Sequence, residues 1–366
     1  MAKVLRYFLG ANSPRGYVSR FDQLGEPGEW RCWLVKGGPG CGKSTLMAQV
    51  SRAMEPHCDT VEEILCTGSP NSLDAVIFPQ HRLAIADATP PHVLEPRYPG
   101  AYERVVSLWP AMDRDMLYGA RKEIISLAQE EKRLRKSAEG YLYAQGALLE
   151  DLASVGASAA DRGRITAYAR RVALREFPGR GSPRPGGREQ VRFLSAVTGR
   201  GVLFLRNTAA ALAPRAIAVE DNWGAASNLL LTVLRDLALE AGLTAVTCRS
   251  PIFPFTKIDH LLLPQLGLGF LTQDKSNARQ LEGLTQRAIH AARFCDAGLL
   301  RERKARSGFL RKAAAGMAEQ AVELLGQAEA VHRQLEGCYG DGVDFAAVSA
   351  IARRTEAELL ACVREG

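Results

Sequence analysis

The sequence predicts an α/β protein of two tandem, similar lobes, each with a mostly parallel sheet flanked by helices and each continued by a long helical extension. Three observations predict this fold. A glycine-rich motif lies between an apolar run and a helical run, the same pattern recurs in the second half, and a stretch of helical composition closes each half. The expected boundaries are residues 1–176 for the first lobe (extension from about 116), 177–190 for a Pro/Gly/Arg-rich linker, and 191–366 for the second lobe (extension from about 281).

The motif at residues 37–45 matches G-x-x-x-x-G-K-[ST], the pattern of the phosphate-binding P-loop. In such a loop backbone N–H groups surround phosphate oxygens, the lysine adds a positive charge, and the hydroxyl after it ligates Mg²⁺. The context fits, because residues 32–35 are an apolar strand and residues 46–50 continue as a helix. We therefore expect a nucleoside triphosphate to be bound by Gly37, Gly38, Pro39, Gly40, Cys41, Gly42, Lys43, Ser44 and Thr45.

A second anchor for the metal is expected at the end of a neighbouring strand. Asp87 follows the apolar residues 83–86, so Ser44 and Asp87 are the predicted Mg²⁺ ligands, with Asp74 as the runner-up carboxylate. Lys43, Asp87 and Arg97 are the predicted catalytic residues, Arg97 being chosen from several arginines to neutralise charge on the transferred phosphoryl group.

No hydrolytic base is evident beside Asp87, because Ala88 stands where many ATPases of this type place a glutamate. Thr89 and His92, a little further along, are candidates to polarise water or to contact a substrate. For both, a role as an ordinary loop residue is the favoured interpretation.

An internal repeat relates the two halves of the chain. Residues 191–194 resemble residues 5–8, residues 263–265 resemble residues 78–80, and residues 350–354 resemble residues 167–171. The offsets run from 186 down to 183, and 183 is half of the 366 residues. Because the matches occur in order at a nearly constant offset, we infer that a whole unit has been duplicated.

The second half has lost the chemistry of the motif. When Gly224 is aligned with Gly40, Asp221 stands at the place of Gly37, Ala226 at Gly42, Ser227 at Lys43 and Asn228 at Ser44. Thr272 likewise ends the strand that ends on Asp87 in the first half. We expect the second lobe to be degenerate, so that each chain has one active site.

The helical extensions carry a heptad-spaced seam, which is typical of a helix that pairs with a neighbour. In the first extension the seam contains Leu127, Leu134, Tyr141 and Leu148. In the second, alanines at 314, 321 and 328 alternate with larger residues and favour close packing. The extensions are therefore expected to pack on each other, and arms that reach a partner are the alternative.

Composition places the chain among globular proteins, with 46% hydrophobic and 24% charged residues and no run long enough for a membrane span. The N-terminus has no pattern of a signal peptide, and the eight cysteines contain no C-x-x-C pair. We expect a cytoplasmic protein with reduced thiols. The net charge of +7 is compatible with anionic ligands, and nucleic acid is possible but not indicated.

The chain resembles a bacterial family of tandem-duplicated P-loop ATPases or nucleotide-kinase-like proteins whose substrate is unassigned. The resemblance rests on residues 37–45, 69–74, 86–92 and 98–100 together with Pro79, and it spans nearly the whole chain. It implies ATP as the nucleotide bound at residues 37–45 and Mg²⁺ held with the help of Asp87.

Three functions remain open at this stage. The first is an ATPase whose hydrolysis drives movement between the lobes, and it is preferred narrowly. The second is a kinase for a nucleotide or other small-molecule acceptor held near the proline-rich loop after Asp87. The third is a non-catalytic scaffold that senses ATP.

Overall fold

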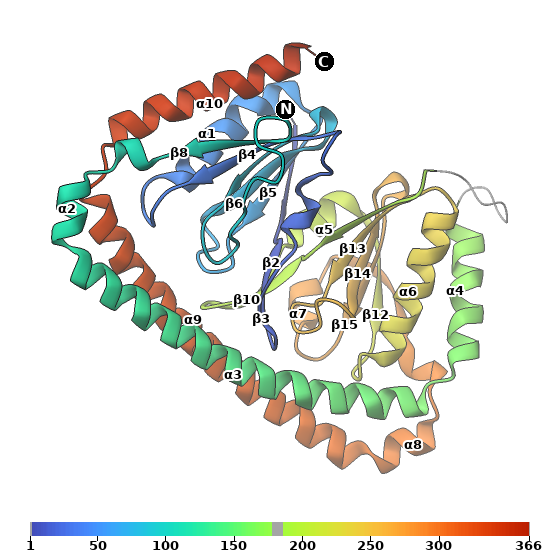
Figure 1. The fold of residues 1–366 in the computed structure, drawn as a ribbon. Helices are drawn as coiled ribbons and strands as arrows, with labels where there is room; N and C mark the ends of the chain where they lie inside the picture. The colour runs from blue at the N-terminus through green and yellow to red at the C-terminus, as the bar shows by residue number, and fades with distance from the viewer. Residues whose placement is uncertain (1, 178–185, 366) are drawn as a thin grey trace.

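The computed structural model describes residues 2–177 and 186–365, which form two similar α/β lobes joined by a pair of long helices (Figure 1). Within these residues each lobe contains one six-stranded sheet, in which five strands are parallel and one is antiparallel to its neighbours. Most of the expected linker, residues 178–185, lies outside the described residues. The expected α/β class and the two similar lobes are confirmed.

The first sheet has the order β1-β5-β6-β7-β4-β8, and a β2–β3 hairpin projects from it. The inner strands are buried on both faces, so their residues are apolar in continuous runs rather than in alternation. The bounds are β1 (Lys3–Tyr7), β2 (Gly10–Ser13), β3 (Gly16–Ser19), β4 (Arg31–Lys36), α1 (Lys43–Met54), β5 (Thr60–Leu65), β6 (Leu73–Phe78), β7 (Leu83–Asp87), β8 (Glu103–Ser107), α2 (Arg114–Gly119), α3 (Arg121–Ala159) and α4 (Arg162–Glu176).

The second sheet has the equivalent order β9-β13-β14-β15-β12-β16. Each strand pairs in the same sense as its counterpart, and β14 is the antiparallel member, as β6 is in the first sheet. The bounds are β9 (Arg188–Arg192), β10 (Ser195–Thr198), β11 (Gly201–Phe204), α5 (Arg206–Leu212), β12 (Arg215–Glu220), α6 (Ala225–Glu240), β13 (Thr244–Arg249), β14 (Ile258–Leu263), β15 (Leu268–Gln273), α7 (Ala278–Leu281), β16 (Thr285–His290), α8 (Ala297–Glu302), α9 (Lys304–Gly340) and α10 (Phe345–Glu365).

The lobes are related by a pseudo-two-fold axis that passes between Phe8 and Phe193. Each of these residues donates its N–H to the carbonyl of the other at 3.0 Å. Their equivalence corrects the first expected match of the repeat by one residue, because Phe8 corresponds to Phe193 and not to Leu194. The local similarity of two apolar strands does not fix such a register, whereas the hydrogen-bonded pairing does.

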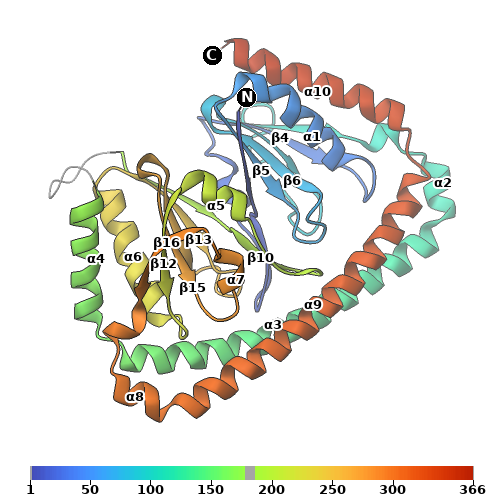
Figure 2. The same cartoon turned by 180° about the vertical axis from the view of Figure 1, so that it is seen from behind.

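The two halves exchange their last helices. Helix α4, from the first half, packs on α6 of the second lobe, and α10, from the second half, packs on α1 of the first lobe (Figures 1 and 2). Ile165 and Ala169 of α4 belong to the core of the second lobe, and their counterparts Val348 and Ala352 of α10 belong to the core of the first. Each compact lobe therefore contains residues from both halves of the chain.

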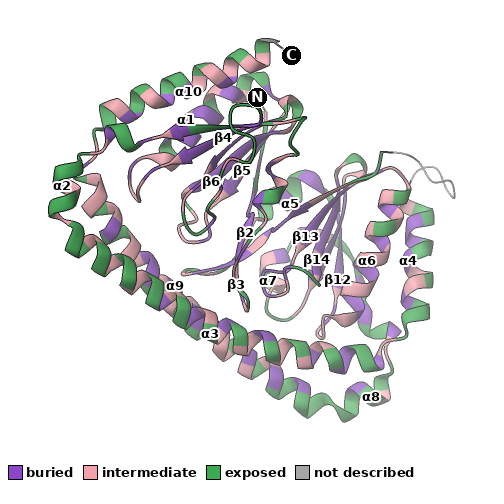
Figure 3. Cartoon of the chain, in the orientation of Figure 1, coloured by how far each residue is buried: buried purple, intermediate pink, exposed green. Residues whose placement is uncertain are grey.

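The exchange is carried by α3 and α9, which run antiparallel along their whole length (Figures 1 and 2). At 39 residues, α3 spans about 58 Å at 1.5 Å per residue. Ala314, Ala321 and Ala328 are buried in α9, which confirms the expected close packing of the two extensions. Figure 3 shows that the outer surface of the pair is exposed, whereas the sheets are buried. No helix of the described residues is both long and apolar enough to cross a membrane.

The lobes also meet through a buried ion pair. Arg192 of β9 donates to the Glu62 carboxylate of β5 at 2.8 and 3.1 Å, and each side chain is only 5% exposed. The guanidinium also lies over the ring of Tyr7, 5.6 Å from its centroid. This pair joins one lobe to the other, and neither charge has access to bulk water.

We predict that Arg192→Met lowers the free energy of unfolding by about 3–5 kcal/mol, because it leaves the Glu62 carboxylate buried without a partner. Adding Glu62→Gln should restore part of this loss. The control is Arg306→Met, which breaks the half-exposed pair of Arg306 with Asp151 and should cost less than about 1 kcal/mol. Denaturant titration gives all the values, and equal effects of Arg192→Met and Arg306→Met would contradict the prediction.

The core of the second lobe contains a titratable side chain that the first lobe lacks. His260 of β14 is 3% exposed and faces the ring of Phe204 at 5.4 Å, and Ala75 holds the same register position in β6. Burial lowers the pKa of His260 to about 4, with Asp259 opposing this effect and Lys257 adding to it. The unfolded chain therefore takes up this proton at a higher pH than the folded one.

We predict that this histidine makes the fold sensitive to acid. Neutral His260 contributes its full stabilisation above the pKa that it has in the unfolded chain, near 6.5. This contribution is lost as the pH falls from there toward the folded-state pKa of about 4. Between pH 7 and 5 the wild type should lose on the order of 2 kcal/mol more free energy of unfolding than His260→Gln. Denaturant titrations at both pH values measure this difference, and parallel losses would refute the assignment.

Candidate functional site

The glycine-rich loop, residues 37–42, follows the carboxyl end of β4 and leads into α1. Gly40 and Gly42 have φ values of 67° and 88°, and Gly42 is the N-cap of the helix. Side chains rarely adopt such φ angles, so glycine is needed at both positions. Successive N–H groups in this kind of conformation, together with a helix N-terminus, form a concave site for an anion.

Lys43 is held at the mouth of this loop by three oxygens. Its Nζ donates to the carbonyls of Gly37 and Gly38 at 3.2 and 2.8 Å and lies 3.5 Å from Asp87 Oδ2. The side chains of Lys43 and Asp87 are only 11% and 14% exposed. The sheet places them together, because β7 is parallel to β4 and Asp87 lies opposite Val35 at the carboxyl ends of both strands.

The two predicted metal ligands are positioned by their neighbours. Asp87 Oδ1 accepts hydrogen bonds from the N–H and the hydroxyl of Thr89, at 2.9 and 2.6 Å, which leaves Oδ2 directed at Lys43. Ser44 Oγ accepts the N–H of Leu73, the first residue of β6, at 2.9 Å. In the described part of the chain no group of three or more His, Cys, Asp or Glu side chains is arranged to hold a metal ion by itself.

A cluster of buried polar side chains lies near Lys43 and Asp87. Asp74 Oδ2 is 3.9 Å from His92 Nδ1, Tyr17 OH is 3.4 Å from the same nitrogen, and the ring of Phe21 stacks on His92 at 4.5 Å. Burial raises the pKa of Asp74 to about 6, with smaller opposite effects from His92 and Cys66. Of the sequence candidates, the structure thus brings Asp74 and His92 together and places Thr89 on Asp87.

The second half of the chain covers the glycine-rich loop. A Cβ on Gly38 would lie 2.6 Å from the ring of Tyr339, and one on Gly40 would lie 2.5 Å from the backbone oxygen of Glu336, both in α9. In the second lobe the large residue is in the loop and the glycine is in the helix, because Trp223 of the loop packs on Gly156 of α3. The loop of each half therefore packs against the long helix of the other half.

The structure does not bring Arg97 to the site. Arg97 is exposed. Its neighbour Tyr98 is anchored near the start of β4, because the Tyr98 N–H donates to the Glu103 carboxylate at 2.8 Å and Glu103 lies opposite Cys32. At about 3.3 Å per residue, Cys32 is about 16 Å from the loop that follows the end of this strand. The physical reason is topological. Asp87 lies at the carboxyl ends of the parallel strands. Because β8 is parallel to β4, the chain after Asp87 must return to the end of the sheet where these strands begin, and Arg97 lies on this returning segment.

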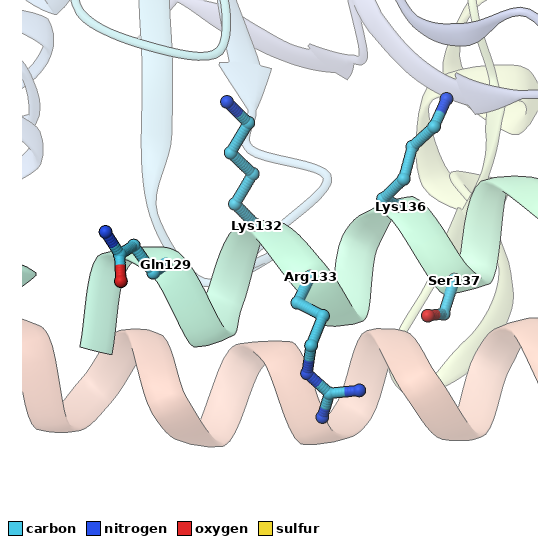
Figure 4. Close-up of a pocket in the computed structure, with 5 residues that line it drawn as sticks. All are labelled: Gln129, Lys132, Arg133, Lys136 and Ser137. Atoms are coloured by element: carbon cyan, nitrogen blue, oxygen red, sulfur yellow. The ribbon is translucent and has the colours of Figure 1, made fainter. Parts of the chain in front are cut away.

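Helix α3 carries basic residues that face the first lobe and that were not among the candidates from the sequence. Figure 4 shows Lys132 and Lys136 rising from α3 on the side of the first lobe's strands, whereas Arg133 points toward α9. Arg135 reaches the loop between β5 and β6, with Nη2 3.1 Å from the position of a Cβ on Gly68. The available signal was the basic run at residues 132–136, which was read only as part of a helix seam.

In the second lobe the equivalent site is closed by its own side chains. Gly224 has a φ of 77°, matching Gly40, and Asn228 Oδ1 accepts the N–H of Ile258 as Ser44 Oγ accepts that of Leu73. These contacts support the expected alignment of Ser227 with Lys43. The Asp221 carboxylate accepts hydrogen bonds from the N–H groups of Trp223 and Ser227, at 2.9 and 2.8 Å. The carboxylate of the loop itself therefore uses these two N–H groups.

The counterparts of Lys43 and Asp87 are neutral hydroxyls. Thr272 lies opposite Val219 in the second sheet, as Asp87 lies opposite Val35 in the first. Ser227 Oγ and Thr272 Oγ1 are both buried, and neither has a hydrogen-bond partner among the described residues.

Comparisons of the chain with protein-family models, with curated proteins and with solved structures find no match. The case for a function therefore depends on the geometry of the site.

We predict that Thr272→Val is neutral or raises the free energy of unfolding by up to about 1 kcal/mol. The substitution removes an unsatisfied buried hydroxyl and keeps the side-chain volume. Thermal and denaturant unfolding measure the change. A loss of more than about 1 kcal/mol would show that this hydroxyl makes a hydrogen bond.

Proposed function

We propose that the first lobe is a P-loop lobe that binds Mg-ATP and hydrolyses it, with one active site per chain. The observation that carries this proposal is the position of Lys43, which is largely buried between the Gly37 and Gly38 carbonyls and 3.5 Å from Asp87. A lysine ammonium held in this way is available to exchange the carbonyls for phosphate oxygens. Backbone N–H groups of residues 37–45 would surround the same phosphates.

The oxygen atoms of Ser44 and Asp87 fit Mg²⁺, which is usually bound by one or two carboxylates together with substrate phosphates and water. When bound, Mg²⁺ neutralises the charge of the phosphates. Thr89 keeps one oxygen of Asp87 occupied and so orients the other.

The Asp74–His92 pair supports a role in activating the attacking group. Ala88 provides no base after Asp87, but Asp74 is buried and close enough to experience the charges of both Asp87 and Lys43. We assign to this pair the orientation of the attacking water. Transfer to an acceptor is the second candidate, favoured by a cavity that lies next to Tyr17 on the far side of His92.

We predict that Mg-ATP stabilises the wild-type protein and not Lys43→Ala. At about 100 times its dissociation constant, ATP should raise the free energy of unfolding by about 2.7 kcal/mol. The matched control is Ser227→Ala, which changes the equivalent position of the second lobe and should respond like wild type. The readouts are the thermal shift relative to each apo variant and the release of inorganic phosphate without an acceptor.

The outcomes separate the candidates. Full stabilisation of Lys43→Ala by Mg-ATP would remove the proposed site, and loss of it in Ser227→Ala would show that both lobes bind. Binding with phosphate release supports the ATPase. Binding without release, followed by turnover when an acceptor is added, would replace it with the kinase.

A further inference from the structure

A cavity of about 260 Å³ lies between the first lobe and α3. The β2–β3 hairpin forms one wall through Asn12 and Tyr17, the loop after Asp87 contributes Pro91, and α3 forms the opposite wall. The tip of the hairpin is seated on the helix, because a Cβ on Gly146 of α3 would lie 2.6 Å from Pro14. Leu325 of α9 also lines it, so the cavity is bounded by four separate segments of the chain.

The helix wall is cationic. Lys132, Arg135 and Lys136 share one face of α3 and all line the cavity, with Glu139 as the acidic residue of the same face. Arg135 pairs with Glu131 at 2.7 Å and Lys136 with Glu139 at 2.9 Å, while Lys132 makes no ion pair within residues 2–177 and 186–365. Lys132 and Lys136 also line a neighbouring surface hollow of about 420 Å³ (Figure 4). Lys132, which is exposed, is therefore the one cation of this lining that no ion pair among the described residues neutralises.

This charge is confined to one copy of the repeat. At the offset of 183 that relates α3 to α9, the positions of Lys132, Arg135 and Lys136 are occupied by Ala315, Ala318 and Glu319. A basic face required only for the solubility of a long helix would not need this asymmetry. The basic face accompanies the lobe that keeps Lys43 and Asp87, and it is missing beside the lobe that has lost them.

The inner wall of the cavity connects it to the nucleotide site. Tyr17 lines the cavity, and its hydroxyl is 3.4 Å from His92 Nδ1, which is 3.9 Å from Asp74. His92 Nε2 is buried and has no hydrogen-bond partner in the described structure. Pro91, next to His92, lies only four residues after Asp87. A ligand in the cavity would therefore touch the segment that carries Asp87 and His92.

We propose that this cavity binds a small dianionic molecule, such as a phosphate monoester, as a second ligand beside the nucleotide. Its three cationic side chains can each donate to phosphate oxygens, and its volume of about 260 Å³ suits a molecule smaller than a nucleotide, since typical ligand pockets measure roughly 300–1,000 Å³. Lys132 supplies the unpaired charge, and Arg135 supplies a guanidinium fork. No residue of the glycine-rich loop lines this cavity, so binding there can be measured without nucleotide.

The test uses the full chain carrying Lys43→Ala, which weakens phosphate binding at the glycine-rich loop. Inorganic phosphate, pyrophosphate and glycerol 3-phosphate are titrated by calorimetry without nucleotide. We expect at least one of these probes to bind, and Lys132→Gln combined with Lys136→Gln should weaken it by about tenfold or more. The matched control is Lys122→Gln, an exposed lysine about 15 Å away on the same helix, which should leave binding unchanged.

Three results would overturn the proposal. They are the absence of binding by all three probes at millimolar concentration, equal weakening by Lys122→Gln, and binding of an oligonucleotide but of none of the small anions. Circular dichroism of each variant checks that α3 is intact. If the small anions bind through Lys132 and Lys136 while Mg-ATP fails to stabilise the chain with an intact Lys43, this second site stands and the proposed ATPase falls.

Discussion

The structure depends on the burial of the outer faces of α1 and α6, which neither half of the chain achieves alone. Val348 and Ala352 of α10 complete the core that contains α1, and Ile165 and Ala169 of α4 complete the core that contains α6. Exposing these faces would forfeit roughly 25 cal/mol for each Å² of apolar surface. The burial requires each helix to reach the other lobe, and α3 and α9 provide the necessary length.

This exchange also brings the candidate site together. The glycine-rich loop comes from the first half, but Tyr339 and Glu336 of α9 pack on it, and their presence explains why glycine is needed at 38 and 40. On the other side of the first lobe, α3 provides the basic wall across from Tyr17. The glycine-rich loop is therefore packed against the same helix pair that joins the two lobes.

The two lobes share one scaffold and differ at the positions of Lys43 and Asp87. Strand order, pairing sense and the register at the ends of β7 and β15 are the same, so the scaffold is equivalent. At the positions of Lys43 and Asp87, the second lobe has Ser227 and Thr272, and the Asp221 carboxylate accepts N–H groups of its own loop. The second lobe thereby supports the first while its own loop is closed to an external anion.

The sequence by itself determined the α/β class, the two similar lobes, the strand that ends on Asp87 and the replacement of Lys43 and Asp87 by Ser227 and Thr272 in the second half, because each is written in short segments or at a nearly constant offset. It did not place Arg97 or His92, since their positions depend on the path of the loop after β7, nor Arg135, since that depends on how α3 lies against the first lobe. Only the tertiary structure decided which lobe each last helix covers. Ile165 and Val348 are near-equivalent apolar residues that fit either lobe, and the direction and length of α3 and α9 choose between them.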